Sequence, residues 1–328
     1  MKAFAYYNPK DVKDAVTVLG RGGGGSLAIA GGTDLLGEMK NGYVSPERVV
    51  NLKSIKGLDR IRSGGDGLRI GALVKLAELA GDKNVRETYA GLAQAAESVG
   101  SPQLRNMGTL GGNICQRPRC WYYRGKEYNC IRKGGGTCFA VSGRNKYHCV
   151  IEGGPCFIVH PSDTAVMLEA MGASVTIQGK SGQRDVKLDD FFVLPTADPI
   201  FENILQPGEI ITEIKVPKPA AGEASCYLKF KERGSRDFAL VSAGVVMVMN
   251  GDTCTRASVV LGGVSPAPYR ATGAETALSG NRVTAASVTA ACDAALAGAD
   301  PMDENAYKLD LAATMIKRAV LRASDVDV

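Results

Sequence analysis

Cysteine is the residue type with the clearest chemical potential in this sequence, because six of the nine cysteines lie between Cys115 and Cys156. The N-terminus lacks the apolar run of a secretion signal, and an odd number of cysteines in such a chain argues against a disulfide framework. A dense group of thiolates is instead typical of iron–sulfur and zinc sites. The sequence therefore predicts a metal site in this stretch.

The spacing of the clustered cysteines favours an iron–sulfur cluster over zinc. Structural zinc sites usually show short paired spacings, whereas even the closest pair here, Cys115 and Cys120, is separated by four residues. Glycine-rich runs at 134–136 and 153–154 suit a loop wrapped around a [4Fe–4S] core, which needs four converging thiolates. A zinc site and a set of free buried cysteines are the alternative interpretations.

Basic residues surround these cysteines, since the stretch from Cys115 to Val150 contains eight Lys or Arg and one Glu. Such cations would stabilise a reduced cluster and would suit an acidic protein partner. The two histidines, His148 and His160, are interpreted as hydrogen-bonded structural residues. Trp121 is interpreted as a packing residue.

Two glycine-rich turns offer a second kind of chemistry, the binding of phosphate by backbone amides. The first turn consists of Ala30, Gly31, Gly32, Thr33, Asp34 and Leu35, and it joins an expected strand to an expected helix. Successive amides beside a helix N-terminus bind phosphate or pyrophosphate. The second turn, 109–113, has the same character, so the two could face each other across a dinucleotide. Neither fits the G-x-G-x-x-G or Walker A pattern, which disfavours a Rossmann or P-loop site.

The elements that would position these turns fall into three segments. Residues 1–56 are predicted to form a small β/α unit. Residues 57–217 are predicted to form a second α/β segment, which the cysteine-rich insertion at 115–156 interrupts. A proline-containing linker at 217–222 is expected to precede a C-terminal α+β domain at 223–328, with three antiparallel strands followed by two helices.

Composition and charge exclude some classes of function. The net charge of +5 comes without a dense basic helix, so nucleic acid is not an expected partner. No stretch of about 18 apolar residues occurs, so no membrane span is expected. With no secretion signal either, the expectation is a soluble, cytoplasmic protein.

The sequence resembles, over essentially its whole length, the FAD-binding medium subunits of the xanthine dehydrogenase and carbon monoxide dehydrogenase group. The resemblance rests on A-G-G-T-D-L at 30–35, T-L-G-G-N at 109–113, H-P-S-D at 160–163, L-Q-P-G-E-I-I at 205–211 and, after Lys229, R-D-F-A-L-V at 236–241. It implies an α+β protein with a two-subdomain FAD-binding fold of the p-cresol methylhydroxylase type and a C-terminal α+β domain.

The resemblance also implies roles for individual residues of a flavin site. The first turn, together with Thr109, Gly112 and Asn113, would hold the pyrophosphate and the adjoining sugar. Asp163 would accept hydrogen bonds from flavin hydroxyls. Leu205 and Lys229 would lie near the isoalloxazine ring, where a cation stabilises anionic reduced flavin.

The insertion resembles that of a subset of the family. The R-C-W-Y-Y-R stretch at 119–124 is similar to the bacterial aldehyde oxidoreductase flavoprotein subunits, and the 4-hydroxybenzoyl-CoA reductase β subunit carries a related insertion. In those relatives the insertion holds a [4Fe–4S] cluster. The match implies that the ligands are Cys120, Cys130, Cys138 and Cys156. Cys149 is the first reserve, and Cys115 is expected to be free.

The function that the resemblance implies is electron transfer within a molybdenum hydroxylase, as one subunit of a hetero-oligomer. A molybdopterin-containing large subunit would convert the organic substrate, and a [2Fe–2S] small subunit would exchange electrons with this FAD. An external carrier such as NAD, ferredoxin or a quinone-linked acceptor would complete the route. The alternatives are a self-standing FAD oxidase, for which no Tyr/His/Glu constellation is seen, and a zinc-stabilised binding or assembly module, which would be colourless.

Overall fold

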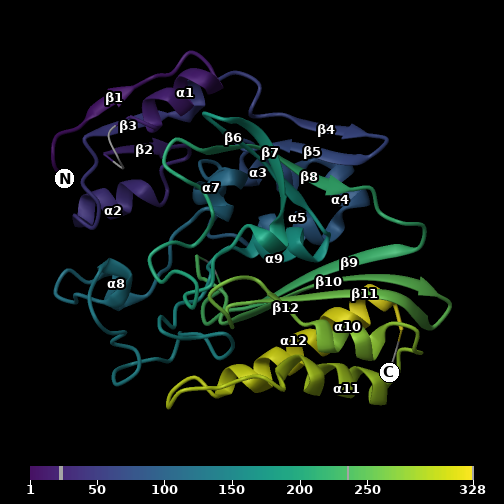
Figure 1. The fold of residues 1–328 in the computed structure, drawn as a ribbon. Coiled ribbons are helices and arrows are strands. Elements are labelled where there is room, and N and C mark those ends of the chain that lie inside the picture. Colours follow the sequence, from purple (N-terminus) through teal and green to yellow (C-terminus); the bar gives the residue numbers. More distant parts are fainter. Residues whose placement is uncertain (22–24, 235, 327–328) are drawn as a thin grey trace.

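The computed structural model describes residues 1–21, 25–234 and 236–326, which form three sheets and the helices that pack on them. A small sheet lies at the N-terminus, a five-stranded sheet lies in the middle, and a four-stranded sheet with its helices forms the C-terminal part (Figure 1). No helix in the described part of the chain is both long and apolar enough to cross a membrane.

The N-terminal part is a parallel sheet in the order β1-β3-β2 with two short helices. Asp11 starts the first helix by accepting a hydrogen bond from the Asp14 amide, and Ala15, Val16 and Leu19 lie on the buried face of that helix. The helix therefore covers the sheet, and β2 leads directly into the first glycine turn. The elements are β1 (Ala5–Tyr7), α1 (Val12–Leu19), β2 (Ser26–Ile29), α2 (Leu35–Asn41), β3 (Arg48–Asn51) and a 3-10 turn (Leu52–Ser54).

The middle part is an antiparallel sheet in the order β4-β5-β8-β6-β7, with its helices gathered around the largest apolar core. The second glycine-rich stretch is itself helical: Thr109 is the N-cap of helix α7, which packs against α9 and β8. The elements are β4 (Ile61–Gly64), β5 (Gly67–Gly71), α3 (Leu76–Gly81), α4 (Lys83–Thr88), α5 (Ala90–Ser98), α6 (Pro102–Arg105), α7 (Leu110–Ile114), α9 (Asp163–Ala170), β6 (Ser174–Gly179), β7 (Gly182–Lys187), a 3-10 turn (Leu188–Asp190) and β8 (Ile210–Pro217).

The cysteine-rich insertion has little regular structure, with one short helix, α8 (Trp121–Arg124), and one 3-10 turn (Ile131–Lys133). It leaves the middle part after α7 and runs beneath α2 before returning to α9 (Figure 1). Its loops therefore lie between the N-terminal part and the C-terminal sheet.

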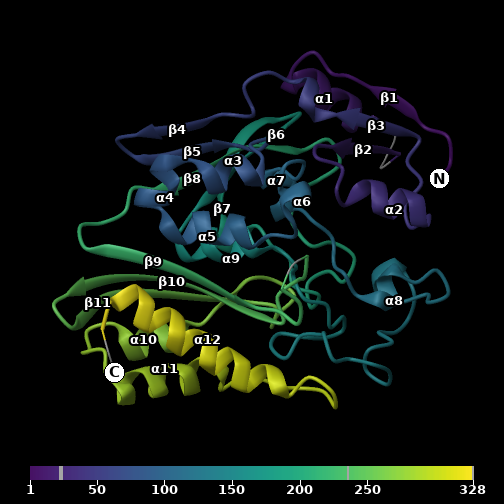
Figure 2. The same ribbon diagram turned by 180° about the vertical axis from the view of Figure 1, so that it is seen from behind.

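The C-terminal part contains a four-stranded sheet in the order β12-β11-β10-β9, so the expectation of three strands was wrong. The additional strand is two residues long, too short to show an alternating pattern. Helices α11 and α12 match the two expected ones, and α10 was not foreseen. Helices α5 and α9 contact the sheet from the middle part (Figure 2). The elements are β9 (Glu223–Phe230), β10 (Val241–Asn250), β11 (Thr253–Gly262), β12 (Tyr269–Arg270), α10 (Thr272–Leu278), α11 (Ala285–Leu296) and α12 (Tyr307–Ser324).

Candidate cofactor sites

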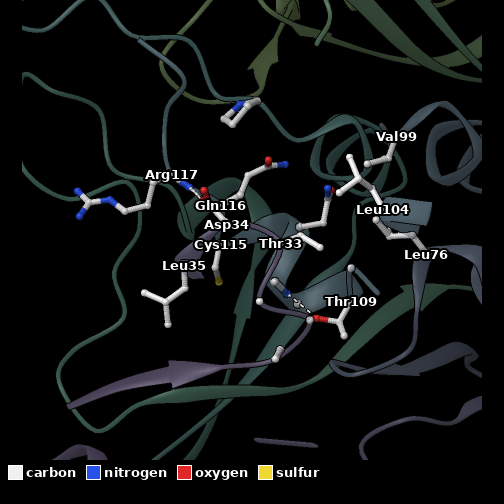
Figure 3. A pocket seen from close by; sticks show the side chains of 18 of the residues that line it. Thr33, Asp34, Leu35, Leu76, Val99, Leu104, Thr109, Cys115, Gln116 and Arg117 are labelled. Atoms are coloured by element: carbon white, nitrogen blue, oxygen red, sulfur yellow. Dashed lines mark hydrogen bonds between the residues drawn. The ribbon is translucent and has the colours of Figure 1, made fainter. Parts of the chain in front are cut away.

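The two glycine turns face one pocket of about 860 Å³, a volume within the range of ligand sites in proteins (Figure 3). The pocket lies where the N-terminal, middle and C-terminal parts meet. All twelve residues that the sequence suggested for a flavin site line it. They are Ala30, Gly31, Gly32, Thr33, Asp34, Leu35, Thr109, Gly112, Asn113, Asp163, Leu205 and Lys229.

The first turn presents free backbone donors to this pocket. Among the described residues, none accepts a hydrogen bond from the amides of residues 31–34. Gly32 has a φ of +72°, which suits glycine, and a Cβ on Gly31 would lie 2.1 Å from the Met107 carbonyl oxygen. The turn therefore has the free amides and the close backbone approach that a phosphate cradle needs.

Asp34 has a different environment from the one its motif suggested. It is the N-cap of α2, yet its carboxylate makes no capping hydrogen bond. It accepts instead from the Arg117 amide at 2.8 Å, from Arg119 Nη1 at 2.5 Å and from Arg124 Nη2 at 2.9 Å. Its side chain thus joins the first turn to the insertion, while its backbone stays at the pocket (Figure 3).

The second turn is fixed by side chains of its own and of α9. Thr109 Oγ1 accepts from the Gly112 amide at 3.3 Å. Asn113 Oδ1 accepts from the hydroxyls of Ser162 and Thr164, each at 2.6 Å. Because the Asn113 oxygen holds this buried turn, the side-chain amide nitrogen is the group left to donate to a ligand.

Asp163 and Lys229 form a buried ion pair at the pocket wall. Lys229 Nζ lies 2.8 Å from Asp163 Oδ2, and Tyr227 donates its hydroxyl to Asp163 Oδ1 at 2.6 Å. Burial raises the pKa of Asp163, while the Lys229 ammonium opposes that rise. The charge of Lys229 is therefore held in place by two protein partners, Asp163 and the Ser98 carbonyl at 3.2 Å.

A second, much smaller cavity of about 10 Å³ lies within the insertion. Besides Arg132, His148 and several apolar and aromatic side chains, four cysteines line it: Cys120, Cys130, Cys138 and Cys156. These are the four that the resemblance implied. Four thiols are the donor set that a cubane cluster needs. The cavity is smaller than a four-iron core, so binding one requires the thiols to move apart.

The other two clustered cysteines lie elsewhere. Cys115 lines the large pocket, and burial raises its pKa to about 12. Cys149 is almost fully buried beside Gly153, outside the lining of the small cavity, and burial raises its pKa to about 12 as well. In the described ranges, no group of three or more His, Cys, Asp or Glu side chains is arranged to hold a metal ion.

Cys120, Cys138 and Cys156 differ in how readily their thiols ionise. A hydrogen bond between Cys138 and Cys156 lowers the pKa of Cys138 and raises that of Cys156. Burial raises the pKa of Cys120, whose sulfur lies 3.2 Å from His148 Nε2. Cys138 is therefore poised to become a thiolate, the form that binds metal.

The basic residues of the insertion are mostly paired internally, which the sequence did not reveal. Six of the eight cations form ion pairs with carboxylates from the rest of the chain. The pairs are Arg117 and Arg132 with Glu202, Arg119 and Arg124 with Asp34, Arg144 with Glu304 and Lys146 with Glu232. The less exposed pairs, those of Arg117, Arg119, Arg124 and Arg132, anchor the insertion, whereas Arg144 and Lys146 form exposed pairs at its surface.

Sequence reasoning missed several residues that shape the large pocket. Arg117 and Arg119 enter it from the insertion, and Tyr227 holds Asp163 from β9. The sequence signal for the two arginines was the R-C-W-Y-Y-R stretch, which begins at Arg119 and lies two residues after Arg117 but was used for the cluster alone. Nothing in the sequence connected residues 117–124 to a turn more than 80 residues earlier.

Comparison with protein families accounts for nearly the whole chain. Residues 2–219 match the FAD binding domain in molybdopterin dehydrogenase, and residues 225–323 match the CO dehydrogenase flavoprotein C-terminal domain. The chain is 36% identical to the aldehyde oxidoreductase FAD-binding subunit PaoB of Escherichia coli, over 95% of each chain. It is 30% identical to the carbon monoxide dehydrogenase medium chain of Hydrogenophaga pseudoflava, over 97% of this chain and 96% of the relative.

Solved structures give the same answer for the fold. The carbon monoxide dehydrogenase structure from Hydrogenophaga pseudoflava superimposes with a TM-score of 0.80 at 30% sequence identity, covering 98% of this chain and 97% of that one. The mixed α/β architecture followed by a C-terminal domain is therefore shared. The chain belongs to the FAD-binding medium subunits of the molybdenum hydroxylase family, whose members include the carbon monoxide dehydrogenase medium chains.

Proposed function

We propose that this chain is the electron-transfer subunit of a molybdenum hydroxylase complex, with FAD in the large pocket and a [4Fe–4S] cluster in the insertion. The observation that carries the proposal is the placement of two cofactor-like residue sets side by side. Twelve flavin-site candidates line one pocket, and four cysteines line a second cavity in the adjoining insertion.

The proposed roles of the pocket residues follow from their geometry. The free amides of residues 31–34 would bind the pyrophosphate, with Thr109, Gly112 and Asn113 on the opposite side. Lys229, fixed by Asp163, would place a positive charge beside the flavin ring, near Leu205. When bound, FAD and the cluster supply the two-electron and one-electron chemistry of the relay.

The cysteine cavity supports a cluster more than it supports zinc. Its four thiols come from separated loop positions without a paired knuckle, and Arg132 and His148 join apolar and aromatic side chains in the rest of the lining. Arg132, almost fully buried, lies with Nη1 3.9 Å from Cys156 Sγ and would offset the negative charge of bound thiolates.

The proposed partners are a molybdopterin-containing large subunit and a [2Fe–2S] small subunit in a hetero-oligomer, with an external carrier such as NAD or ferredoxin. The relatives support a multi-subunit assembly, because two of them are named as a medium chain and a FAD-binding subunit. The paired charges of the insertion remove the electrostatic argument for ferredoxin over other carriers. The cytoplasm is the proposed location.

The deciding experiment is to measure iron, zinc, acid-labile sulfide and flavin per chain on anaerobically purified protein. We expect about four iron, about four sulfide and about one FAD. One zinc per chain in place of iron would turn the insertion into a structural element and end the relay proposal. Absence of flavin would contradict the whole assignment.

The self-standing FAD oxidase is the competing function. It requires reduction of the flavin by an organic substrate in the isolated chain. We expect the isolated chain to stay oxidised with aldehydes or purines and to be reduced only in the complete complex. Rapid bleaching of the flavin by a substrate in the isolated chain would favour the oxidase.

A further inference from the structure

The segment from Arg117 to Arg124 forms part of the wall of both cavities. Arg117 and Arg119 line the large pocket, whereas Cys120, Tyr122 and Tyr123 line the small one. The segment is therefore shared by the two sites, and a shift in its backbone changes both.

Asp34 and Glu38, on the first turn of α2, hold this segment from the side of the large pocket. Arg124 reaches both carboxylates, with Nη2 at 2.9 Å from Asp34 Oδ1 and 3.4 Å from Glu38 Oε1. Tyr123 donates its hydroxyl to Glu38 Oε1 at 3.1 Å. Glu38 is almost fully buried, so these bonds are shielded from solvent.

The orientation of the Asp34 side chain joins the first glycine turn to the Arg117–Arg124 segment. An N-cap aspartate ordinarily accepts from its own helix, but this one accepts from three donors of the insertion instead. The backbone of Asp34 belongs to the turn whose free amides face the large pocket. The position of that turn therefore depends on the insertion segment.

We propose that the Arg117–Arg124 segment couples the two sites, so that FAD binds more tightly when the cysteine cavity holds its cluster. The inference rests on the proposed function. A bound cluster fixes Cys120, and with it the three donors that hold Asp34. Loss of the cluster releases Cys120, and the turn that receives the pyrophosphate loses its support. Because coupling between two binding equilibria is reciprocal, FAD also stabilises the cluster.

The test measures the dissociation constant of FAD by flavin fluorescence, on full-length protein with and without iron. Iron is removed anaerobically with a chelator, and iron per chain is determined in each sample. We expect FAD affinity to fall about tenfold on iron removal, equivalent to about 1.4 kcal/mol. In the reverse direction, protein stripped of FAD should lose iron to the chelator several-fold faster than protein that retains it.

Arg124→Gln tests the route of the coupling. It removes the charge that contacts Asp34 and Glu38, so the affinity for FAD should be low in both iron states and the tenfold difference should vanish. Arg144→Gln is the matched control, because Arg144 lies in the same insertion but pairs with Glu304. Its tenfold difference should persist. If Arg124→Gln does not fold, the rate at which the unmodified chain loses iron, with and without FAD, still tests the coupling.

Two outcomes overturn the inference in distinguishable ways. Equal FAD affinity with and without iron, in protein that starts with about four iron per chain, contradicts the coupling and leaves the cluster standing. Protein that contains flavin but never iron contradicts the cluster itself, and the coupling fails with it.

Discussion

At the scale of the residue, the choice of ligands among the clustered cysteines is the sharpest question. Cys156 lines the small cavity with Cys120, Cys130 and Cys138, whereas Cys149 is buried against Gly153 outside that lining. We expect Cys156→Ser to lose most of its iron and sulfide, because a four-iron core needs four thiolates. We expect Cys149→Ser to retain nearly all of both.

The measurement is iron and acid-labile sulfide per chain after anaerobic purification of the two variants. Serine is nearly the same size as cysteine, so either variant should fold. If Cys156→Ser keeps its iron and sulfide while Cys149→Ser loses most of both, the assignment is reversed and Cys149 is the fourth ligand.

His160 makes stability depend on pH. Burial lowers its pKa to about 3, while an unfolded histidine titrates near 6.5. Between these values the unfolded chain binds a proton that the folded chain does not, so stability falls as the pH drops below about 6.5. At pH 5 the loss from this one residue is about 2 kcal/mol relative to pH 7.5.

His160→Asn should therefore show a smaller loss of unfolding free energy between pH 7.5 and pH 5, by about 2 kcal/mol. Asparagine keeps an acceptor for the Ser162 amide, which donates to His160 Nδ1 at 3.4 Å. Urea unfolding at both pH values measures the difference. If the unfolding free energy of the two proteins falls equally between pH 7.5 and pH 5, a group other than His160 causes the loss of stability at low pH.

The first glycine turn of the large pocket could be predicted because its signal is local, whereas the places of Asp163, Leu205 and Lys229 came from the family resemblance alone. Strand, glycine turn and helix follow one another within a dozen residues at the first turn, and the backbone amides there need no distant partner. The insertion contacts were not predictable in this way. The partners of Arg124 lie far away in the sequence, and a run of arginines gives no indication of which carboxylates it will meet.

At the scale of the element, helix α12 holds the end of the insertion. Lys308 is almost fully buried and donates to three backbone carbonyls, those of Tyr147, His148 and Gly263. Lys308→Met keeps the apolar stem and removes all three donors. We expect a loss of about 2–5 kcal/mol in unfolding free energy, because buried carbonyls are left without partners.

Chemical unfolding with urea measures that loss, and Lys317→Met on the same helix provides a control at a position outside these contacts. Lys308→Met should also lose iron faster to a chelator. Lys308 holds the backbone of residues 147 and 148, and His148 lines the cysteine cavity. Unchanged stability would mean that water replaces the ammonium without cost.

The lengths of the elements explain where the predicted secondary structure differs from the observed one. A helical pattern of apolar residues extends over 85–99, yet Tyr89 leaves helical geometry and divides α4 from α5. Both pieces keep an apolar face on one core, so hydrophobic periodicity continues across the break. Strand β12 was not predicted for the opposite reason: its two residues are too few to show a periodic pattern. Strong, long patterns such as β10 and α12 were predictable.

At the scale of the whole molecule, the insertion is bound by all three parts of the chain. Asp34 and Glu38 hold it from the N-terminal part, and Glu202 pairs with Arg117 and Arg132 from the middle part. Asn305 donates to the carbonyls of His148 and Cys149 from the C-terminal part. The insertion therefore connects the three parts instead of projecting from one of them.

Removal of the cluster should consequently loosen the backbone at three separate places. We expect hydrogen–deuterium exchange to increase at α2, at residues 199–204 and at the start of α12 when iron is removed, because each loses a fixed partner. The β4–β5 hairpin, on the far side of the middle sheet, is the internal reference and should not change. An increase confined to 115–156 would mean that the insertion folds and unfolds alone, and that its ion pairs to the three parts contribute little to the integrity of the molecule.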